Sequence, residues 1–168
     1  VVALQRHRQP SEWIDKFFLD FTVGHPTYQH IRCFRSGVPA ALLMLGFRAD
    51  TVEQVVAQAR ALQADLQSQN LGYAYPLVLG DQSNLVWDVR KAGLGLIRNL
   101  PGDSQPVNLI EACAVAPEDL PAYVGDVQAL LAEEGVLASY YAHAGAGELH
   151  IEPFLNLKSP EGVKQFRR

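Results

Sequence analysis

The chain has little cysteine and no long apolar run. Its 168 residues include two cysteines, Cys33 and Cys113, and no CxxC spacing. We therefore expect neither an iron–sulfur cluster nor a disulfide scaffold in these residues. No apolar stretch approaches the ~20 residues that a membrane-spanning helix needs. Two scattered cysteines fit a reducing compartment, so we expect a cytoplasmic protein, and membrane association through the rest of a longer protein stays open.

Positive charge is also scarce. The formal net charge is -4 and no stripe of lysine and arginine occurs, so nucleic-acid binding is not expected. The chain starts abruptly with Val1 instead of methionine, which favours a fragment of a longer protein. Its apolar fraction of 48% and charged fraction of 19% are typical of a globular domain with a core of its own.

Hydrophobic periodicity predicts helices and strands that alternate along the chain. Helices are expected over 11–23, 51–70, 82–100 and 117–134, and from 160 onward. Strands are expected over 40–47, 73–79 and 107–115, and in a hairpin over 136–152. This order predicts an α+β fold, with a mostly antiparallel sheet and helices packed on one of its faces.

Local signals refine these expectations. Ser11 is the expected N-cap of the first helix, and Thr51 forms a capping box with Gln54 at the start of the second. The continuous apolar run over 40–47 predicts a buried central strand. Gly93 and Gly95 leave two alternatives open: a close approach of another group to a continuous helix, or a helix that ends near residue 92.

The stretch around which the chain is organised carries two histidines at the ends of a glycine-containing turn. Gly145 and Gly147 can supply the positive φ values that a tight reversal needs. If residues 144–147 form the loop, His143 lies opposite Glu148 across the hairpin. His150 is then a diagonal neighbour of His143, with Cβ atoms roughly 7 Å apart, close enough for both imidazoles to bind one ion.

Strand parity adds further residues to the same face. Tyr141 and Glu152 lie two positions from His143 and His150 on their strands, so all four side chains are expected on one side of the sheet. The alternative is the solvent-exposed face of an edge hairpin. For an isolated pair of histidines, the residues alone favour that alternative.

Three blocks of the sequence together resemble the C-terminal domain of FAD-linked oxidases, the group that includes D-lactate, glycolate and D-2-hydroxyglutarate dehydrogenases. Residues 85–96, LVWDVRKAGLGL, are similar to its W-x-x-R-(K/E)-x-G segment. Residues 106–115, PVNLIEACAV, resemble P-V-x-x-x-E-D-x-A-V, and residues 143–150, HAGAGELH, resemble H-x-G-D-G-N-L-H. Order and spacing agree over about 39–168, which gives the expected domain, with 1–38 as a helical lead-in of the same unit.

The resemblance implies a ferredoxin-like α+β domain that caps a flavin and shapes the binding site of a 2-hydroxy acid. FAD is implied as the cofactor. A separate FAD-binding domain of the full-length protein would bind the FAD, because no Gly-rich phosphate-binding segment precedes residue 39. The isolated domain is therefore expected to be inactive, and small-molecule substrate and FAD-binding domain are its expected partners.

The resemblance also implies roles for single residues. In several relatives the two histidines of the third block ligate a divalent metal such as zinc, which implies His143 and His150 as ligands here. A neutral imidazole near the substrate hydroxyl can accept its proton, and we assign this catalytic role to His150. Arg90 of the first block is expected to hold the substrate carboxylate, with Tyr141 as a second substrate contact.

The chain departs from the family pattern at several positions of the site. Relatives often carry an acidic residue, a basic residue and an Asp at the following three positions: Ala112, Gln105 and Ala146. Glu148 replaces the common Asn, and Glu152 stands where relatives often have Arg or Asn. The third metal ligand of relatives comes from a Glu-His-Gly motif further downstream, and Glu148 or Glu152 lies on the right face to replace it. We name Glu148. The alternative function is a non-catalytic binding or interaction module with a degraded metal site.

Overall fold

A single antiparallel sheet forms the centre of the structure, a computed structural model that describes residues 11–22, 25–26, 28 and 36–168. Its strands are β1 (Ser11–Asp15), β2 (Ala41–Leu45), β3 (Gln105–Pro106), β4 (Ile110–Ala114), β5 (Ala138–His143) and β6 (Glu148–Leu155). The order is β2-β1-β5-β6, and both β3 and β4 pair with β6. The strand pairings among the described residues are all antiparallel, so the expected α+β class is confirmed.

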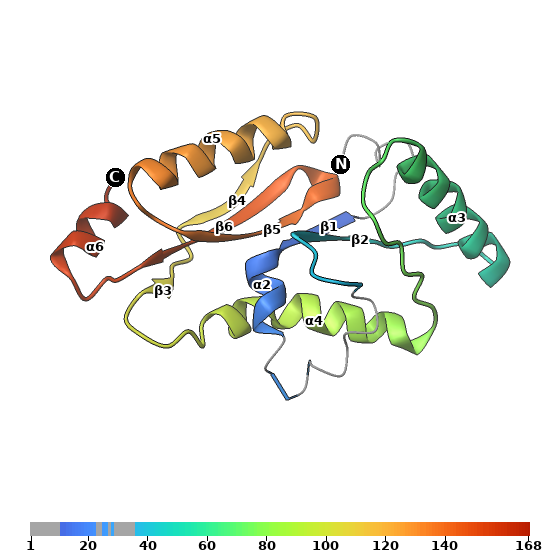
Figure 1. The fold of residues 1–168 in the computed structure, drawn as a ribbon, viewed down its shortest axis with the longest axis horizontal. Helices are drawn as coiled ribbons and strands as arrows, with labels where there is room; N and C mark the ends of the chain where they lie inside the picture. The colour runs from blue at the N-terminus through green and yellow to red at the C-terminus, as the bar shows by residue number, and fades with distance from the viewer. Residues whose placement is uncertain (1–10, 23–24, 27, 29–35) are drawn as a thin grey trace.

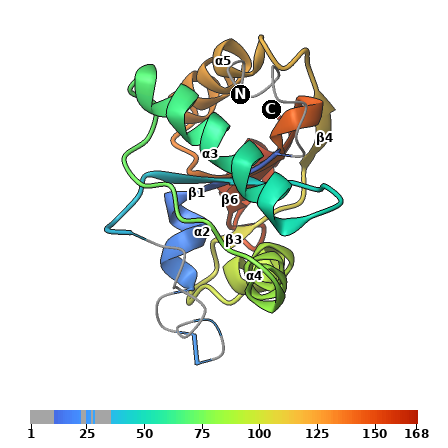
Figure 2. The ribbon, with the colours of Figure 1, turned by 90° about the vertical axis from the view of Figure 1, so that its right-hand side faces the viewer.

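Helices cover both faces of this sheet. They are α2 (Lys16–Phe21), α3 (Val52–Ser68), α4 (Asp81–Ile97), α5 (Leu120–Glu133) and α6 (Pro160–Phe166). In Figure 1, α3 and α5 lie above the sheet, whereas α2 and α4 lie below it, and Figure 2 shows the same two layers from the side. The expectation of helices on one face is therefore wrong.

The two helical layers follow from strands that are apolar on both faces. On one face, Ile14 and Tyr141 pack with Phe18 of α2 and Val89 of α4. On the other face, the neighbouring residue Tyr140 and other strand residues pack against these side chains of α5: Tyr123, Val124, Val127 and Leu131. Since successive residues of a strand point to opposite faces, each apolar set needs its own cover.

The N-terminal segment corrects a prediction. Residues 11–15, expected to begin a helix, form β1, which pairs with β2 on one side and β5 on the other. The helix begins only at Lys16, and its N-cap is Asp15, whose Oδ1 accepts from the Phe18 backbone N–H at 2.8 Å. Ser11 is thus a strand residue. Cys33 and the larger part of the expected lead-in over 1–38 lie outside the described residues.

Two strand predictions change as well. The apolar run over 40–47 yields β2, but among the described residues β2 pairs with β1 alone and is an edge strand, not a central one. Residues 73–79 contain no strand; their backbone is irregular, and Pro76, which cannot donate to a ladder, lies in the middle. The capping box of Thr51 and Gln54 is present as predicted at the start of α3.

Gly93 and Gly95 lie inside a continuous helix, which was one of the two alternatives for 82–100. α4 runs through both Gly93 and Gly95 to Ile97. A Cβ on Gly93 would lie 1.5 Å from Cε2 of Phe18, so the missing side chain is what lets α2 pack onto α4. This contact fixes α4, and with it Arg90, beneath β1 and β5.

Candidate functional site

The hairpin of β5 and β6 has the predicted register. His143 lies opposite Glu148, and Tyr141 lies opposite His150. Residues 144–146 form a short 3-10 turn, and Gly147 closes it with a φ of 72°. A Cβ on Gly147 would lie 2.0 Å from the carbonyl oxygen of Val115, so both the backbone conformation and the space require glycine there. Gly145 is not among the described glycines with positive φ, contrary to expectation.

This register brings the two imidazoles together on one face of the sheet. The ring centroids of His143 and His150 are 5.4 Å apart, with the rings at 78° to each other. Ligand atoms of His143, Glu148 and His150 all lie within 4.8 Å of one another. The side chain of His150 is 14% exposed and that of His143 is 45% exposed, so the cluster opens to solvent on the His143 side. The alternation of side chains along the two paired strands had predicted this convergence.

A carboxylate stands behind each imidazole. Nδ1 of His143 lies 2.7 Å from Oε1 of Glu12, and Nδ1 of His150 lies 2.7 Å from Oε2 of Glu111. A carboxylate only accepts, so in each neutral ring the proton resides on Nδ1 and the lone pair is on Nε2. Carboxylates that bind the outer nitrogen of metal-ligating histidines orient those rings and raise their basicity. The donor set therefore fits a divalent cation.

Glu12 also binds Arg90, a contact that the sequence did not reveal. Its Oε2 accepts from Nε and one terminal nitrogen of Arg90 at 3.1 and 2.8 Å. The side chains of both residues are largely buried. Sequence reasoning missed Glu12 because 11–15 was expected to be helical, which gave no reason to place it beside the hairpin. The guanidinium expected to hold a substrate carboxylate thus already has an anionic partner.

Tyr141 links Arg90 to His150 by stacking. The Arg90 guanidinium carbon lies 5.0 Å from the centroid of the Tyr141 ring, and that ring stacks on His150 with centroids 4.6 Å apart at 15°. The Tyr141 hydroxyl donates to Oε1 of Glu152 at 3.3 Å. Burial and the neighbouring carboxylates raise the pKa of Tyr141, so the hydroxyl keeps its proton at neutral pH. The ring is therefore a rigid spacer between the predicted site residues.

A pair of carboxyl groups completes the buried side of the site. Glu152 is fully buried, and its carboxyl group is adjacent to that of Glu111. Burial first, and then the adjacent carboxyl group of Glu111, raise the pKa of Glu152 to about 7. Among the described residues, Oε1 of Glu111 and Oε2 of Glu152 have no hydrogen-bond partner. Below its raised pKa the carboxyl group of Glu152 is neutral and can donate a hydrogen bond, which a carboxylate cannot do.

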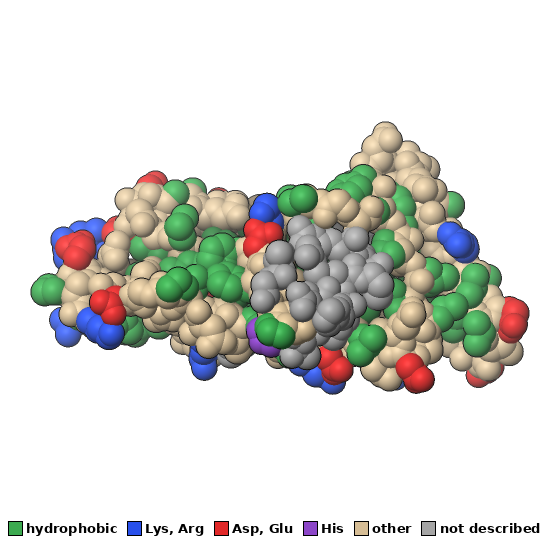
Figure 3. Space-filling view, turned by 60° about the horizontal axis from the view of Figure 1, so that its bottom comes forward, with side chains coloured by type: hydrophobic (Ala, Val, Ile, Leu, Met, Phe, Trp, Pro, Cys, Tyr) green, Lys and Arg blue, Asp and Glu red, His purple; other side chains and the backbone are tan. Residues whose placement is uncertain are grey.

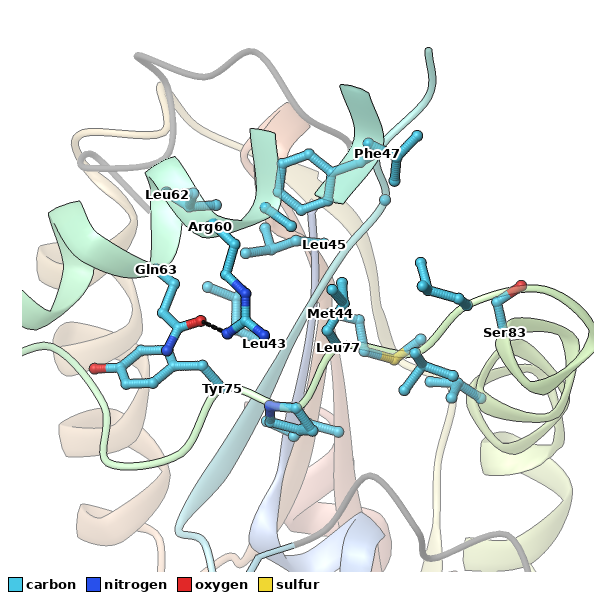
Figure 4. A pocket seen from close by; sticks show the side chains of 18 of the residues that line it. Leu43, Met44, Leu45, Phe47, Arg60, Leu62, Gln63, Tyr75, Leu77 and Ser83 are labelled. Carbon is cyan, nitrogen blue, oxygen red and sulfur yellow. Dashed lines mark hydrogen bonds between the residues drawn. The ribbon is translucent and has the colours of Figure 1, made fainter. Parts of the chain in front are cut away.

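A hollow lies away from the histidine cluster. It has a volume of about 1150 Å³ and lies between β2, α3 and the segment over 71–80. Leu43 and Leu45 of β2 and Leu62 of α3 line it, with the guanidinium of Arg60 bonded to Gln63 at its margin (Figure 4). Hydrophobic side chains also gather on the surface at this end of the molecule, which carries α3 and the start of α4 (Figure 3). None of the predicted site residues lines this hollow.

The comparisons with known proteins identify the family of this chain. Residues 9–168 match the family model described as FAD linked oxidases, C-terminal domain. The chain is 34% identical to a D-2-hydroxyglutarate dehydrogenase of Pseudomonas putida over 122 residues, which is 70% of this chain and 12% of that protein. It is 32% identical to a D-2-hydroxyglutarate dehydrogenase of Haemophilus influenzae over 120 residues, 68% of this chain and 11% of that protein.

The chain thus spans about a ninth to an eighth of the length of these relatives. Among the described residues, no helix has the length and apolar character that a membrane crossing requires. The family match extends over nearly the whole chain, including β1, which supplies Glu12. The chain belongs to the family of FAD-linked oxidases, as their C-terminal domain.

Proposed function

We propose that this domain forms the substrate-binding side of a flavin-dependent oxidoreductase that oxidises a 2-hydroxy acid, with FAD held mainly by a separate domain of the full-length protein. The observation that carries the proposal is the convergence of His143, Glu148 and His150 on one face of the sheet. Family membership supports the flavin, and the names of the relatives support a 2-hydroxy acid as the substrate class.

In this proposal His143, His150 and Glu148 hold a divalent cation such as zinc. Nε2 of each histidine is free for this task because Glu12 and Glu111 take the Nδ1 atoms. Glu148 supplies a carboxylate oxygen 3.8 Å from Nε2 of His150. Two imidazoles and one carboxylate with an open position form a common catalytic zinc set. Such a cation, when bound, acts as a Lewis acid on the hydroxyl and carboxylate oxygens of the substrate.

The chain's own residues then orient the substrate. The hydroxyl and carboxylate of a 2-hydroxy acid would face the open side of the cluster, next to the half-exposed ring of His143. Tyr141 and the carboxyl pair of Glu111 and Glu152 shield the buried side and restrict water there. FAD supplies the two-electron oxidation itself.

The two roles assigned to His150 compete for one atom. A general base needs the free lone pair of Nε2, and a metal ligand uses the same lone pair, since Nδ1 is bound to Glu111. We therefore propose His150 as a ligand, and the general-base role would apply only when no cation occupies the site. Arg90 can hold a substrate carboxylate only by sharing its guanidinium with Glu12.

The test uses the full-length protein with its flavin. Anaerobic reduction of the flavin by a panel of 2-hydroxy acids should occur with the unmodified protein. It should slow by more than roughly 100-fold in His143→Ala and His150→Ala. His25→Ala is the matched control, because the ring of His25 packs against Tyr28 outside the site. A full-length protein that binds no flavin, or histidine variants that reduce it at the normal rate, would refute the proposal.

One observation favours the second candidate, a non-catalytic binding module. The site gathers four glutamates, Glu12, Glu111, Glu148 and Glu152, and its Arg90 guanidinium is already paired with Glu12. An excess of carboxylates disfavours a small anion unless a cation is bound. If the domain binds a cation and the flavin is not reduced by any 2-hydroxy acid, the binding module is the better description.

A further inference from the structure

We propose that Glu12 is a positioning residue, whose single carboxylate fixes the ring of His143 and holds Arg90 beside it. The inference rests on the proposed cation site, because it gives Glu12 the task of presenting His143 to that cation. It adds to the site a residue that neither the sequence motifs nor the hairpin contain.

The position of Glu12 follows from the pairing of β1 with β5. Trp13 lies opposite Ala142 and Ile14 lies opposite Tyr141, so the next position in this register brings Glu12 opposite His143. Glu12 also shares the sheet face of Ile14, two positions along the strand. The strand that sequence periodicity missed thus puts a carboxylate directly beside the more exposed histidine.

Each oxygen of Glu12 has its own partner. Oε1 lies 2.7 Å from Nδ1 of His143, and Oε2 accepts from two nitrogens of Arg90 at 3.1 and 2.8 Å. The side chain of Glu12 is 13% exposed, so water competes little for these bonds. Hydrogen bonds that involve an ion are stronger than neutral ones, and the fork of Arg90 restricts the rotation of the carboxylate.

His143 depends on this anchor more than His150 does. The ring of His150 is held by stacking on Tyr141 as well as by Glu111, and its side chain is 14% exposed. The side chain of His143 is 45% exposed, and among the described residues its side-chain hydrogen bond is to Glu12. Without Glu12, the ring of His143 is free to rotate and to carry its proton on either nitrogen.

The experiment compares ring tautomers and zinc affinity in the metal-free 168-residue chain. Long-range 1H–15N spectra, recorded where both rings are neutral, report which nitrogen carries the proton. We expect the Nδ1–H form for His143 and His150 in the unmodified chain. In Glu12→Ala, His143 should lose this form while His150 keeps it, and the zinc Kd from calorimetry should rise about 10- to 100-fold.

Two further variants separate positioning from stability. The double change Glu12→Leu with Arg90→Met removes the uncompensated guanidinium that could unfold the single variant, and it should alter His143 in the same way. Arg90→Met alone breaks the ion pair but keeps the Glu12–His143 contact, so the tautomer of His143 should not change. The proposal is overturned if Glu12→Ala keeps the tautomer and the zinc affinity, or if Arg90→Met shifts His143 equally. If zinc does not bind at all but the tautomers respond as described, the cation site fails and the positioning role stands.

Discussion

The carboxyl groups of Glu152 and Glu111 lie next to each other at the buried edge of the histidine site. Glu152 has no exposed surface, and its pKa is raised to about 7 by burial and by the adjacent carboxyl group of Glu111. Because the pKa of Glu152 therefore differs between the folded and the unfolded chain, the free energy of unfolding depends on pH.

The free energy of unfolding should fall as pH rises from about 4.5 to about 7. Glu152 titrates near its ordinary pKa of 4.5 in the unfolded chain and near 7 in the folded one. Between these values the folded state retains a proton that the unfolded state has lost, so the contribution is complete below 4.5 and lost above 7. We expect the difference between the unmodified chain and Glu152→Gln to change by up to roughly 3 kcal/mol over this range.

Urea unfolding at several pH values, with a chelator present, measures this difference. Gln keeps the shape of the side chain and can donate to Glu111, but it does not titrate in this range. A constant difference between the two proteins from pH 4 to pH 8 would contradict the raised pKa of Glu152.

Gly93→Ala should destabilise the chain although it lies inside a helix. The new Cβ would lie 1.5 Å from Cε2 of Phe18, so we expect a loss of about 1–3 kcal/mol in the free energy of unfolding. Gly95→Ala is the matched control, since nothing lies within 4 Å of its Cβ, and it should stabilise by up to about 1 kcal/mol. Thermal unfolding distinguishes the two, and adding Phe18→Leu to Gly93→Ala should restore part of the loss.

Gly147→Ala should disrupt the turn that brings the histidines together. Its Cβ would meet the Val115 carbonyl oxygen at 2.0 Å, on a backbone with φ of 72°. Gly135→Ala controls for the backbone strain, because Gly135 has φ of 65° with open space around it. We expect Gly135→Ala to cost about 1 kcal/mol, and Gly147→Ala to cost more and to weaken zinc binding as well. Equal stability losses in the two variants would show that the contact with Val115 is unimportant.

Asp15 joins β1, α2 and β5 through one carboxylate. It accepts from the Phe18 backbone N–H, from the Tyr140 backbone N–H at 2.8 Å and from the Ser139 hydroxyl. Asp15→Ser retains a helix cap but is too short to reach Tyr140, whose buried N–H then lacks a partner. We expect a loss of about 1–3 kcal/mol for Asp15→Ser and a larger loss for Asp15→Ala, by urea unfolding. Similar losses for both would mean that only the cap matters.

The convergence of His143 and His150 could be predicted because it depends on neighbours in the sequence. A loop over 144–147 fixes which residues lie opposite one another, and parity then fixes the face. The capping box of Thr51 and Gln54 was predictable for the same reason, since its two hydrogen bonds span three residues.

Glu12 could not be predicted, because its role depends on contacts far along the chain. Trp13, Phe17, Phe18 and Phe21 recur at steps of three and four, which is typical of a helix. The structure divides this pattern at Asp15, and the strand before it gains its stability from β2 and β5. Tertiary pairing thus overrides local periodicity where a segment has partners on both sides.

The sequence by itself determined the α+β class through its hydrophobic periodicity. It also determined the register of the β5–β6 hairpin and the face on which its histidines lie, because hydrogen bonds between near neighbours fix both. Only the tertiary structure decided that helices cover both faces, that β2 is an edge strand, and that Arg90 is paired with Glu12. The Arg90–Glu12 pair joins residues 78 positions apart, and the other two features also join distant segments, set by which apolar faces can be buried together.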